Sequence, residues 1–325
     1  MSEQFRQATA ETPPSPQEQF LRESLPLQFN TQTASLRDVG LLESIFKEIT
    51  PADDDLVIEL QEGITGMDGR PYPLPTLEQI TKHFSQEKYD KKISQGFTKL
   101  LIVPFAYPLA TIRARYEQAL IKHHEEGKLL DREGTLLDLN TKHPLGFWKD
   151  FDKSDETDGL IYYPKQFDKE NHGGYTKQEL LTSTAPEARA QAPFHGFHIL
   201  LIKPDLTIPT EKVAQTTNGR KDLEAGKSSK EYLNIIQTDP QYRSEQGMTM
   251  EDSFILGLIS LHETNRVLDD WQNEKDSINF NIGTFHKASD CIPGSYWYRT
   301  LRQASVNGVT QRYSSGYYGL RTAVG

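Results

Sequence analysis

The order of the helical and strand patterns constrains the fold of this chain more than any other feature. Thr76, with Gln79 three residues later, matches a capping box, and the apolar spacing that follows predicts a helix starting at Thr76. The apolar run "GFTKLLIVP" (residues 96–104) predicts a buried strand. A helix is expected directly after it, because Pro108 suits a first turn and Gly127 suits a C-terminal stop.

The second half of the chain shows the same mixture. The run "GFHILLIKP" (residues 196–204) repeats six of the nine residues of "GFTKLLIVP", which leaves open two strands in equivalent settings or a chance match between short apolar peptides. A short strand is predicted around residues 160–163, and a long helix is predicted from Thr249, a good N-cap residue, over "TMEDSFILGLISLHETNRVLDDW". Helices and strands follow one another without a sustained strand–helix–strand alternation. This favours an α+β fold over a doubly wound sheet.

The N-terminal segment has a different composition. Residues 1 to about 35 are rich in Gln, Glu, Ser, Thr and Pro, with few aliphatic side chains to offset the entropy of ordering. From "SLRDVGLLESIFKEIT" onward the spacing of Leu41, Ile45 and Phe46 predicts a helix. We therefore expect residues 1–49 to form a mobile leader and a first helix, and residues 50–325 to form a single domain, since no linker-like stretch divides them.

Charge and cysteine content narrow the function classes. The net charge of −10 argues against a protein that holds nucleic acid, because phosphate backbones require a clustered excess of Lys and Arg. The single cysteine, Cys291, excludes a disulfide framework within the chain and a cysteine-based zinc site. No run approaches the ~20 apolar residues of a membrane helix, and the start of the chain lacks a signal-peptide pattern. We expect no membrane span and, by default, a cytoplasmic location.

Candidate catalytic or metal-binding motifs are few. His123 to Glu126 ("HHEE") precede a predicted helix stop, where solvated polar residues are common, and "HETN" at His262 lacks the second histidine of a zincin. The aspartates of "DKSDETDGLIYY" do not fit an EF-hand, because the twelfth position is not Glu. Cys291 has no recognisable catalytic partner in the sequence and reads as a plain loop thiol. We expect neither an enzyme nor a metal or cofactor site.

The C-terminal segment differs from everything before it. From residue 288 to the end there is no Lys, Glu or Met, and Asp290 is the only acidic residue. Five of the fourteen tyrosines lie between Tyr296 and Tyr318, among Ser, Gly, Asn and Arg. Binding surfaces use this composition: Tyr provides rigid amphipathic contact area, Ser, Gly and Asn provide adaptable hydrogen bonds, and Arg provides anchors. A packed pair of C-terminal strands is the alternative, but it does not explain so many tyrosines without an apolar alternation.

At these residues the chain resembles a known family. "INFNIGTFHKASDCIPGSYWYRTLRQASVNGVTQRYSSGYYGLRTAV" (residues 278–324) resembles the variable region of diversity-generating retroelement target proteins with a C-type-lectin-like fold, of the archaeal and small-genome bacterial type. Stretches such as "QGFTKLLIVPFAYPL" and "NHGGYTKQELL" extend the resemblance over roughly residues 50–325. "GSYWYRT…GLRTA" is more distantly similar to formylglycine-generating-type domains, whose redox cysteines are missing here.

The resemblance implies an α+β, C-type-lectin-like (formylglycine-generating-enzyme-related) fold with helical and loop insertions, and a variable region at residues 288–324. Such retroelements mutate adenines, and changes from Asn codons do not reach Lys, Glu, Gln, Met or Trp; the tail lacks Lys, Glu and Met. Trp297, Gln303 and Gln311 would then be fixed. The implied scaffold residues are Trp297, Arg302, Gly319 and Arg321. The implied ligand-contact residues are Ser295, Tyr296, Tyr298, Thr300, Leu301, Ser305, Asn307, Thr310, Arg312, Ser314, Tyr317 and Tyr318.

The function implied by the resemblance is display of a hypervariable surface that binds a protein or another macromolecule. The alternative is a carbohydrate-binding lectin or an enzyme on the same scaffold. A calcium-dependent lectin would need clustered carboxylates near the site, and the tail contains Asp290 alone.

Overall fold

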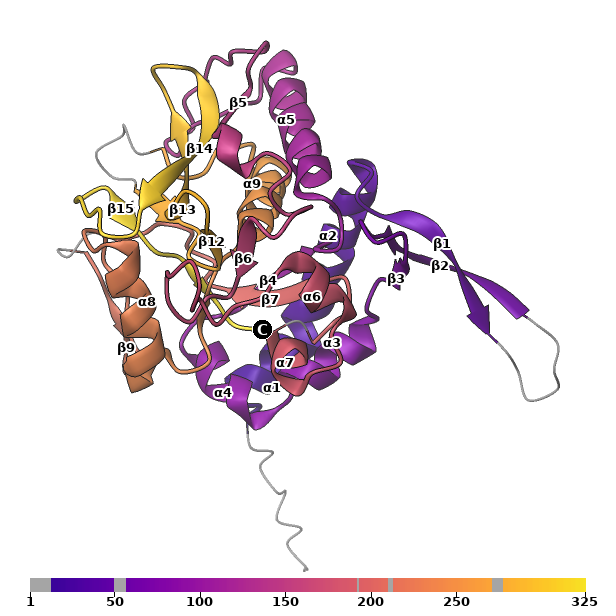
Figure 1. The fold of residues 1–325 in the computed structure, drawn as a ribbon. Coiled ribbons are helices and arrows are strands. Elements are labelled where there is room, and N and C mark those ends of the chain that lie inside the picture. Colours follow the sequence, from indigo (N-terminus) through magenta and orange to yellow (C-terminus); the bar gives the residue numbers. More distant parts are fainter. Residues whose placement is uncertain (1–12, 50–56, 192, 210–212, 271–276) are drawn as a thin grey trace, which may run out of the picture.

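The computed structural model describes residues 13–49, 57–191, 193–209, 213–270 and 277–325. The fold is mixed α and β, as predicted (Figure 1). No helix in these ranges is long and apolar enough to cross a membrane.

The N-terminal segment is helical where it is described. Helices α1 (Pro16–Gln19) and α2 (Leu25–Asp38) are joined by the π-helical turn η1 (Phe20–Ser24). Ser15 and Glu18 form a capping box at the start of α1. Phe20, Leu25 and Leu36 are buried in the main core. The expectation of a mobile leader is therefore wrong from residue 16 onward, because a few well-placed apolar residues anchor a segment whose average composition is polar; residues 1–12 lie outside the described residues.

Two glutamines of α2 complete the edge of a central strand. Strand β4 (Lys99–Val103) pairs on one side with β7 (His198–Ile202). On its other side the Gln28 side chain accepts from the Leu100 amide (2.8 Å), and the buried Gln32 side chain accepts from the Ile102 amide (3.0 Å) and donates to the Leu100 carbonyl. Four residues of helix rise about 6 Å and two residues of strand about 6.6 Å, so a Gln pair at this spacing matches alternate strand residues. The helix thereby protects a sheet edge.

A twisted β-ribbon follows α2 and projects from the body (Figure 1). Strand β1 (Glu43–Ile49) pairs antiparallel with β2 (Val57–Thr65), and β2 pairs with β3 (Pro71–Pro73). The helix predicted over Leu41, Ile45 and Phe46 is thus wrong: the chain turns at Gly40 (φ 70°) and continues as a strand in which Ile45 is buried. The predicted division at residue 50 falls between two paired strands.

The patterns predicted in the first half of the domain are confirmed. Thr76 and Gln79 form the capping box of α3 (Leu77–Phe84), and α5 (Leu109–Glu125) follows β4 and stops before Gly127 (φ 65°). The two similar apolar runs are β4 and β7, and they pair with each other, Lys99 opposite Ile202. The other elements of this half are α4 (Glu87–Ser94), β5 (Leu145–Phe147), the 3-10 turn η2 (Lys149–Phe151), β6 (Leu160–Tyr162), α6 (Lys177–Thr182) and α7 (Pro186–Gln191).

Helix α9 (Met250–Thr264) is the central helix of the core. Thr249 caps it with Asp252, as predicted, and Asn265 ends it in the left-handed conformation (φ 60°), earlier than the sequence pattern indicated. Every residue from Met250 to Leu261 is buried except Ser253, so the helix is buried on almost all sides rather than along one stripe. It packs against α5 and β4.

The last part of the chain forms the largest sheet. Strand β13 (Cys291–Tyr298) pairs along one edge with β11 (Ile278–Phe280) and β12 (Thr284–His286), and along the other with β14 (Gln303–Thr310). Strands β15 (Tyr318–Gly319), β6 and β5 extend the sheet. The remaining elements are β8 (Thr216–Thr217), β9 (Arg220–Lys221), α8 (Ser229–Thr238), η3 (Pro240–Tyr242), β10 (Gln246–Gly247) and β16 (Thr322–Ala323). The backbone amide and carbonyl of Val324 then form two hydrogen bonds with the backbone of Leu201 in β7. These bonds join the tail to the centre of the fold.

The aspartate-rich loop before β6 has a structural role. Asp155 is buried and its carboxylate accepts from Lys177 (2.8 Å) and from the Leu109 amide at the start of α5 (2.7 Å). Lys177 is fully buried and also pairs with Glu251 (2.7 Å), which accepts from Tyr162 (2.6 Å). A buried charge is tolerated only when it is paired in this way. Asp155 and its neighbour Ser154 are both buried, so this part of the loop belongs to the interior of the fold.

We predict that Gln32→Ala lowers the free energy of unfolding by about 1–3 kcal/mol, because it leaves buried backbone groups of β4 without partners. Asn30→Ala, at an exposed position of the same helix, is the matched control and should stay within about 0.5 kcal/mol of the parent. Urea unfolding of the two variants measures both values. Equal stability of the two variants would show that α2 does not secure the edge of β4.

Candidate functional site

The hairpin of β13 and β14 has one buried face and one partly exposed face, on which Tyr296 and Tyr298 are half-buried and Asn307 is exposed. Side chains alternate along a strand, so Trp297 lies on one face and its neighbours Tyr296 and Tyr298 on the other. Trp297 is 1% exposed and packs in the main core with Ala304 and Val306 of β14. Its amide donates to the Asp269 carbonyl (3.0 Å). Trp297 therefore attaches the hairpin to the main core, as expected of a scaffold residue.

The opposite face carries a group of polar aromatic side chains, which we call the tyrosine surface: Tyr296, Tyr298, Asn307, Tyr313 and Tyr318. The rings of Tyr296 and Tyr298 lie 5.8 Å apart, and those of Tyr313 and Tyr318 lie 5.3 Å apart. Asn307 lies opposite Gly294 in the hairpin and donates to the Tyr296 hydroxyl (2.6 Å). The tyrosine surface therefore brings four of the predicted contact residues together.

Gly294 joins the two halves of the tyrosine surface. It lies two residues before Tyr296 and therefore on the same face of β13. A Cβ built at this glycine would lie 3.6 Å from the Tyr318 ring. Burial, and then the neighbouring hydroxyls of Tyr296 and Tyr313, raises the pKa of Tyr318 to about 12. Burial also raises the pKa of Tyr296. Both phenols are therefore neutral hydrogen-bonding groups at physiological pH.

Two predicted contact residues lie below this surface. Ser305 is 3% exposed at its position between β13 and β5 in the sheet, opposite Tyr296, so its prediction as a contact residue is wrong; its hydroxyl bonds to Tyr296 and supports that ring. Ser295 is half-buried on the Trp297 face, where its hydroxyl accepts from Asn281 (3.3 Å). Tyr318 is also half-buried, because its ring stacks on Phe280 with centroids 4.8 Å apart.

The other predicted contact residues lie at the two ends of the hairpin. Thr300 and Leu301 form its exposed tip. At the far end of β14, eight residues and roughly 23 Å away along the strand, the exposed segment leading into β15 carries the rest. These residues are Thr310, Arg312, Ser314 and Tyr317. The predicted set is thus a central surface with two outlying exposed groups.

An arginine that the sequence did not single out anchors the hairpin tip. Arg299 donates to both carboxylate oxygens of Asp270 (2.8 and 2.9 Å) and to Asp131 (2.9 Å). The hydrogen bonds that Arg299 donates to Asp270 raise the pKa of Arg299, while burial raises the pKa of Asp270 against the opposing effect of Arg299. The partners come from loops far away in the sequence, so no local pattern could reveal the pairing.

Arg302, predicted as scaffold, plays a smaller part. Its side chain is exposed and pairs with the exposed Asp138. Its backbone is in the left-handed conformation (φ 54°) and its carbonyl accepts from the Asn140 amide (2.8 Å), so the main chain rather than the guanidinium shapes the turn. The expectation of a scaffold side chain is wrong at this position.

Gly319 and Arg321 have the surroundings of scaffold residues. A Cβ at Gly319 would come within 2.2 Å of Ile208, which no side chain could accommodate without rearrangement. Arg321 is 8% exposed and pairs with Asp269 (2.8 Å), whose carbonyl also receives the Trp297 amide. Asp269 therefore joins the end of the tail to the hairpin. Tyr313, at 49% exposure, is the tyrosine of the surface that the family resemblance did not select.

The chemistry-bearing motifs of the sequence form no site among the described residues. No group of three His, Cys, Asp or Glu in these ranges could hold a metal ion. His123 is buried and bonds to the Ala119 carbonyl, and burial lowers the pKa of His262 beside it. Cys291 opens β13 and is buried rather than in a loop, which raises the pKa of its thiol. Comparisons of the chain with protein-family models, with curated protein sequences and with solved structures find no match.

We predict that Arg299→Ala lowers the free energy of unfolding by about 1–3 kcal/mol, because it leaves two carboxylates facing each other without a cation. Arg302→Ala removes an exposed ion pair from the same turn and should cost less than about 1 kcal/mol. Chemical unfolding distinguishes the two variants. A larger loss from Arg302→Ala would mean that the tip is held differently.

Proposed function

We propose that this chain is a ligand-binding protein whose C-terminal hairpin displays a diversified surface on a C-type-lectin-like scaffold. The ligand is a protein or another macromolecule, bound through the tyrosine surface and the exposed segments at the two ends of the hairpin. The observation that carries the proposal is the alternation along β13, where Trp297 is 1% exposed between two tyrosines of the opposite face. Such an alternation lets one residue hold the hairpin in the core while its neighbours contact a ligand.

The chemistry of the surface supports contact with a macromolecule. Tyr side chains offer a large, rigid area with few rotatable bonds, so ordering them on binding costs little entropy. The five residues of the tyrosine surface carry no formal charge, while exposed Arg312 follows at the end of β14. Neutral aromatic centres with charged groups toward the edge are typical of binding surfaces.

The support beneath the surface explains how it could vary. Trp297, Arg299, Gly319 and Arg321 are held by groups outside the hairpin face, including Asp269, Asp270 and Ile208. None of these contacts uses a side chain of the tyrosine surface. Replacing the surface residues therefore leaves the anchoring contacts in place.

The retroelement origin predicts a specific arrangement of the neighbouring DNA. Beside the gene we expect a near-copy of the segment that encodes residues 288–324, differing from it only at adenines, and a gene for a reverse transcriptase. Sequencing the flanking DNA decides this point. Flanking DNA without such a copy would contradict diversification, although it would leave a fixed binding surface.

We predict that exchanging Tyr298, Asn307, Arg312 and Tyr317 together for Ser changes the free energy of unfolding by less than about 2 kcal/mol, because the exposed positions 307, 312 and 317 cost about 0.5 kcal/mol or less each and Tyr298 is only half-buried. Trp297→Ala alone should cost about 3–5 kcal/mol, since it empties a buried site. Tyr318 is kept in the fourfold variant because its ring stacks on Phe280. Thermal and urea unfolding measure both variants, and collapse of the fourfold variant beside a harmless Trp297→Ala would refute the division into surface and scaffold.

A further inference from the structure

A groove of about 510 Å³ lies between helix α4 and the turn that follows α8. One wall is a face of α4, and the other is formed by η3 and the two residues after it. The volume is within the range of small-molecule sites, roughly 300–1,000 Å³. Every lining residue belongs to the described ranges, and none of the predicted contact residues is among them. The groove is therefore separate from the tyrosine surface.

Basic side chains dominate the lining of the groove. Lys88, Lys91 and Lys92 share one face of α4, because they lie three and four residues apart. Arg243 lines the opposite wall, and Glu87 is the only carboxylate among the lining residues. Four cations and one carboxylate leave an excess of three positive charges, in a chain whose net charge is −10.

Three of these cations have no anionic partner. Among the described residues, no carboxylate forms an ion pair with Lys88, Lys91 or Arg243. The ammonium of Lys88 lies 4.5 Å from the centroid of the Tyr89 ring, and burial at this position lowers the pKa of Lys88. The ring attracts a cation without neutralising its charge. An anion in the groove would supply the missing counter-charge.

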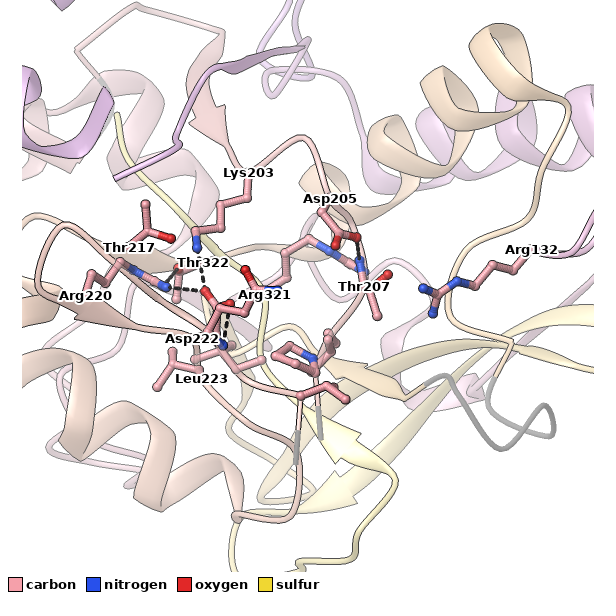
Figure 2. A pocket seen from close by; sticks show the side chains of 15 residues that line it. Arg132, Lys203, Asp205, Thr207, Thr217, Arg220, Asp222, Leu223, Arg321 and Thr322 are labelled. Atoms are coloured by element: carbon pink, nitrogen blue, oxygen red, sulfur yellow. Dashed lines mark hydrogen bonds and ion pairs between the residues drawn. The ribbon is translucent and has the colours of Figure 1, made fainter. Parts of the chain in front are cut away.

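Lys92 is paired, but through a network with a surplus of positive charge. Its buried ammonium bonds to Glu245 (2.7 Å), which also pairs with Arg220 (2.7 Å). Arg220 and Lys203 both bond to Asp222 (Figure 2). Three cations thus share two carboxylates. The network therefore adds to the positive potential of the groove instead of cancelling it.

The two walls of the groove are held together before any ligand binds. The Lys92 ammonium on α4 donates to the Gln241 carbonyl in η3 (3.0 Å) as well as to Glu245. The Gln241 side chain in turn accepts from the Lys221 amide (2.8 Å). These contacts fix the position of η3 relative to α4. The groove therefore needs no large rearrangement to receive an anion.

The rest of the lining indicates which anion fits. Pro240 is the only apolar residue among the lining residues, and none of them is aromatic, so a large carbon body or a nucleobase would have no packing partner. A phosphate group concentrates about two negative charges and three acceptor oxygens on one centre. Linked phosphates match neighbouring lysines on a helix face, and an arginine guanidinium binds phosphate oxygens in pairs.

We propose that this groove binds a small polyphosphate, a ligand with two or more linked phosphate groups, through Lys88, Lys91 and Arg243. The site does not depend on the function proposed for the tyrosine surface.

Isothermal titration calorimetry of the full chain with pyrophosphate tests the proposal, and citrate, a small carboxylate of similar charge, is the matched probe. Pyrophosphate should bind, and its affinity should fall as salt is added. Citrate should bind at least about tenfold more weakly, because its charges lie on separate groups joined by carbon. Absence of pyrophosphate binding, equal binding of citrate, or tighter binding of a single-stranded oligonucleotide would overturn the proposal.

The triple variant Lys88→Gln, Lys91→Gln, Arg243→Gln tests the location. All three side chains are exposed, so the fold should be retained, and Lys92 is kept because it is buried and paired. Pyrophosphate affinity should fall about tenfold or more, since three charge contacts are removed together.

A second triple variant, Lys142→Gln, Lys149→Gln, Lys230→Gln, is the matched control. It removes the same charge at exposed positions outside the groove and should bind pyrophosphate as the parent does. The fourfold surface variant should also bind normally. Unchanged affinity in the groove variant would contradict the assignment. An equal loss in the control would contradict it too, because net charge alone would then govern binding.

Discussion

The burial of Trp297 is the contact on which the C-terminal half of this structure depends. Strand geometry places neighbouring side chains on opposite faces, so a tryptophan fixed in the core forces Tyr296 and Tyr298 outward. The register with β14 then sets Ala304 beside Trp297 and places Asn307 on the tyrosine face. A shift of one residue would reverse every one of these positions. The tyrosine surface thus follows from the burial of the Trp297 ring and from the two-residue alternation of side chains along a strand.

The contacts that hold this register lie outside the hairpin. Asp269 receives the Trp297 amide on its carbonyl and Arg321 on its carboxylate, and Asp270 beside it pairs with Arg299. Both aspartates follow helix α9, in which every residue from Met250 to Leu261 except Ser253 is buried. The hairpin is therefore positioned by contacts with the centre of the fold that do not use the side chains of Tyr296, Tyr298 or Asn307.

The sequence predicted local elements well where a periodic pattern coincided with a cap. The capping box at Thr76, the N-cap at Thr249 and the apolar runs of β4 and β7 are confirmed. Prediction failed where distant partners decide the structure. The N-terminal helices are secured by three buried apolar side chains and by glutamines that bond to the edge of β4. So few residues do not change the average composition of the segment, on which the prediction was based. Residues 43–49 became a strand because β2 pairs with them, against a helical spacing of apolar residues.

The same distinction applies to the candidate site. The composition of the tail indicated a binding surface, and its tyrosines are grouped on one face, but Ser305 is buried between β13 and β5 and Arg299 replaces Arg302 as the anchored arginine. Neither outcome follows from the tail alone, because β5, Asp131 and Asp270 lie elsewhere in the sequence.

The most direct test of this account is saturation substitution of residues 288–324, with the abundance of folded protein measured for each variant. The account predicts a profile that alternates along β13 and β14: high tolerance at Tyr298 and Asn307, low tolerance at Trp297 and Val306, and low tolerance again at Gly319 and Arg321. A flat profile, or one in which Tyr298 and Asn307 tolerate less change than Trp297, would contradict the central claim that a fixed scaffold carries an independently variable surface.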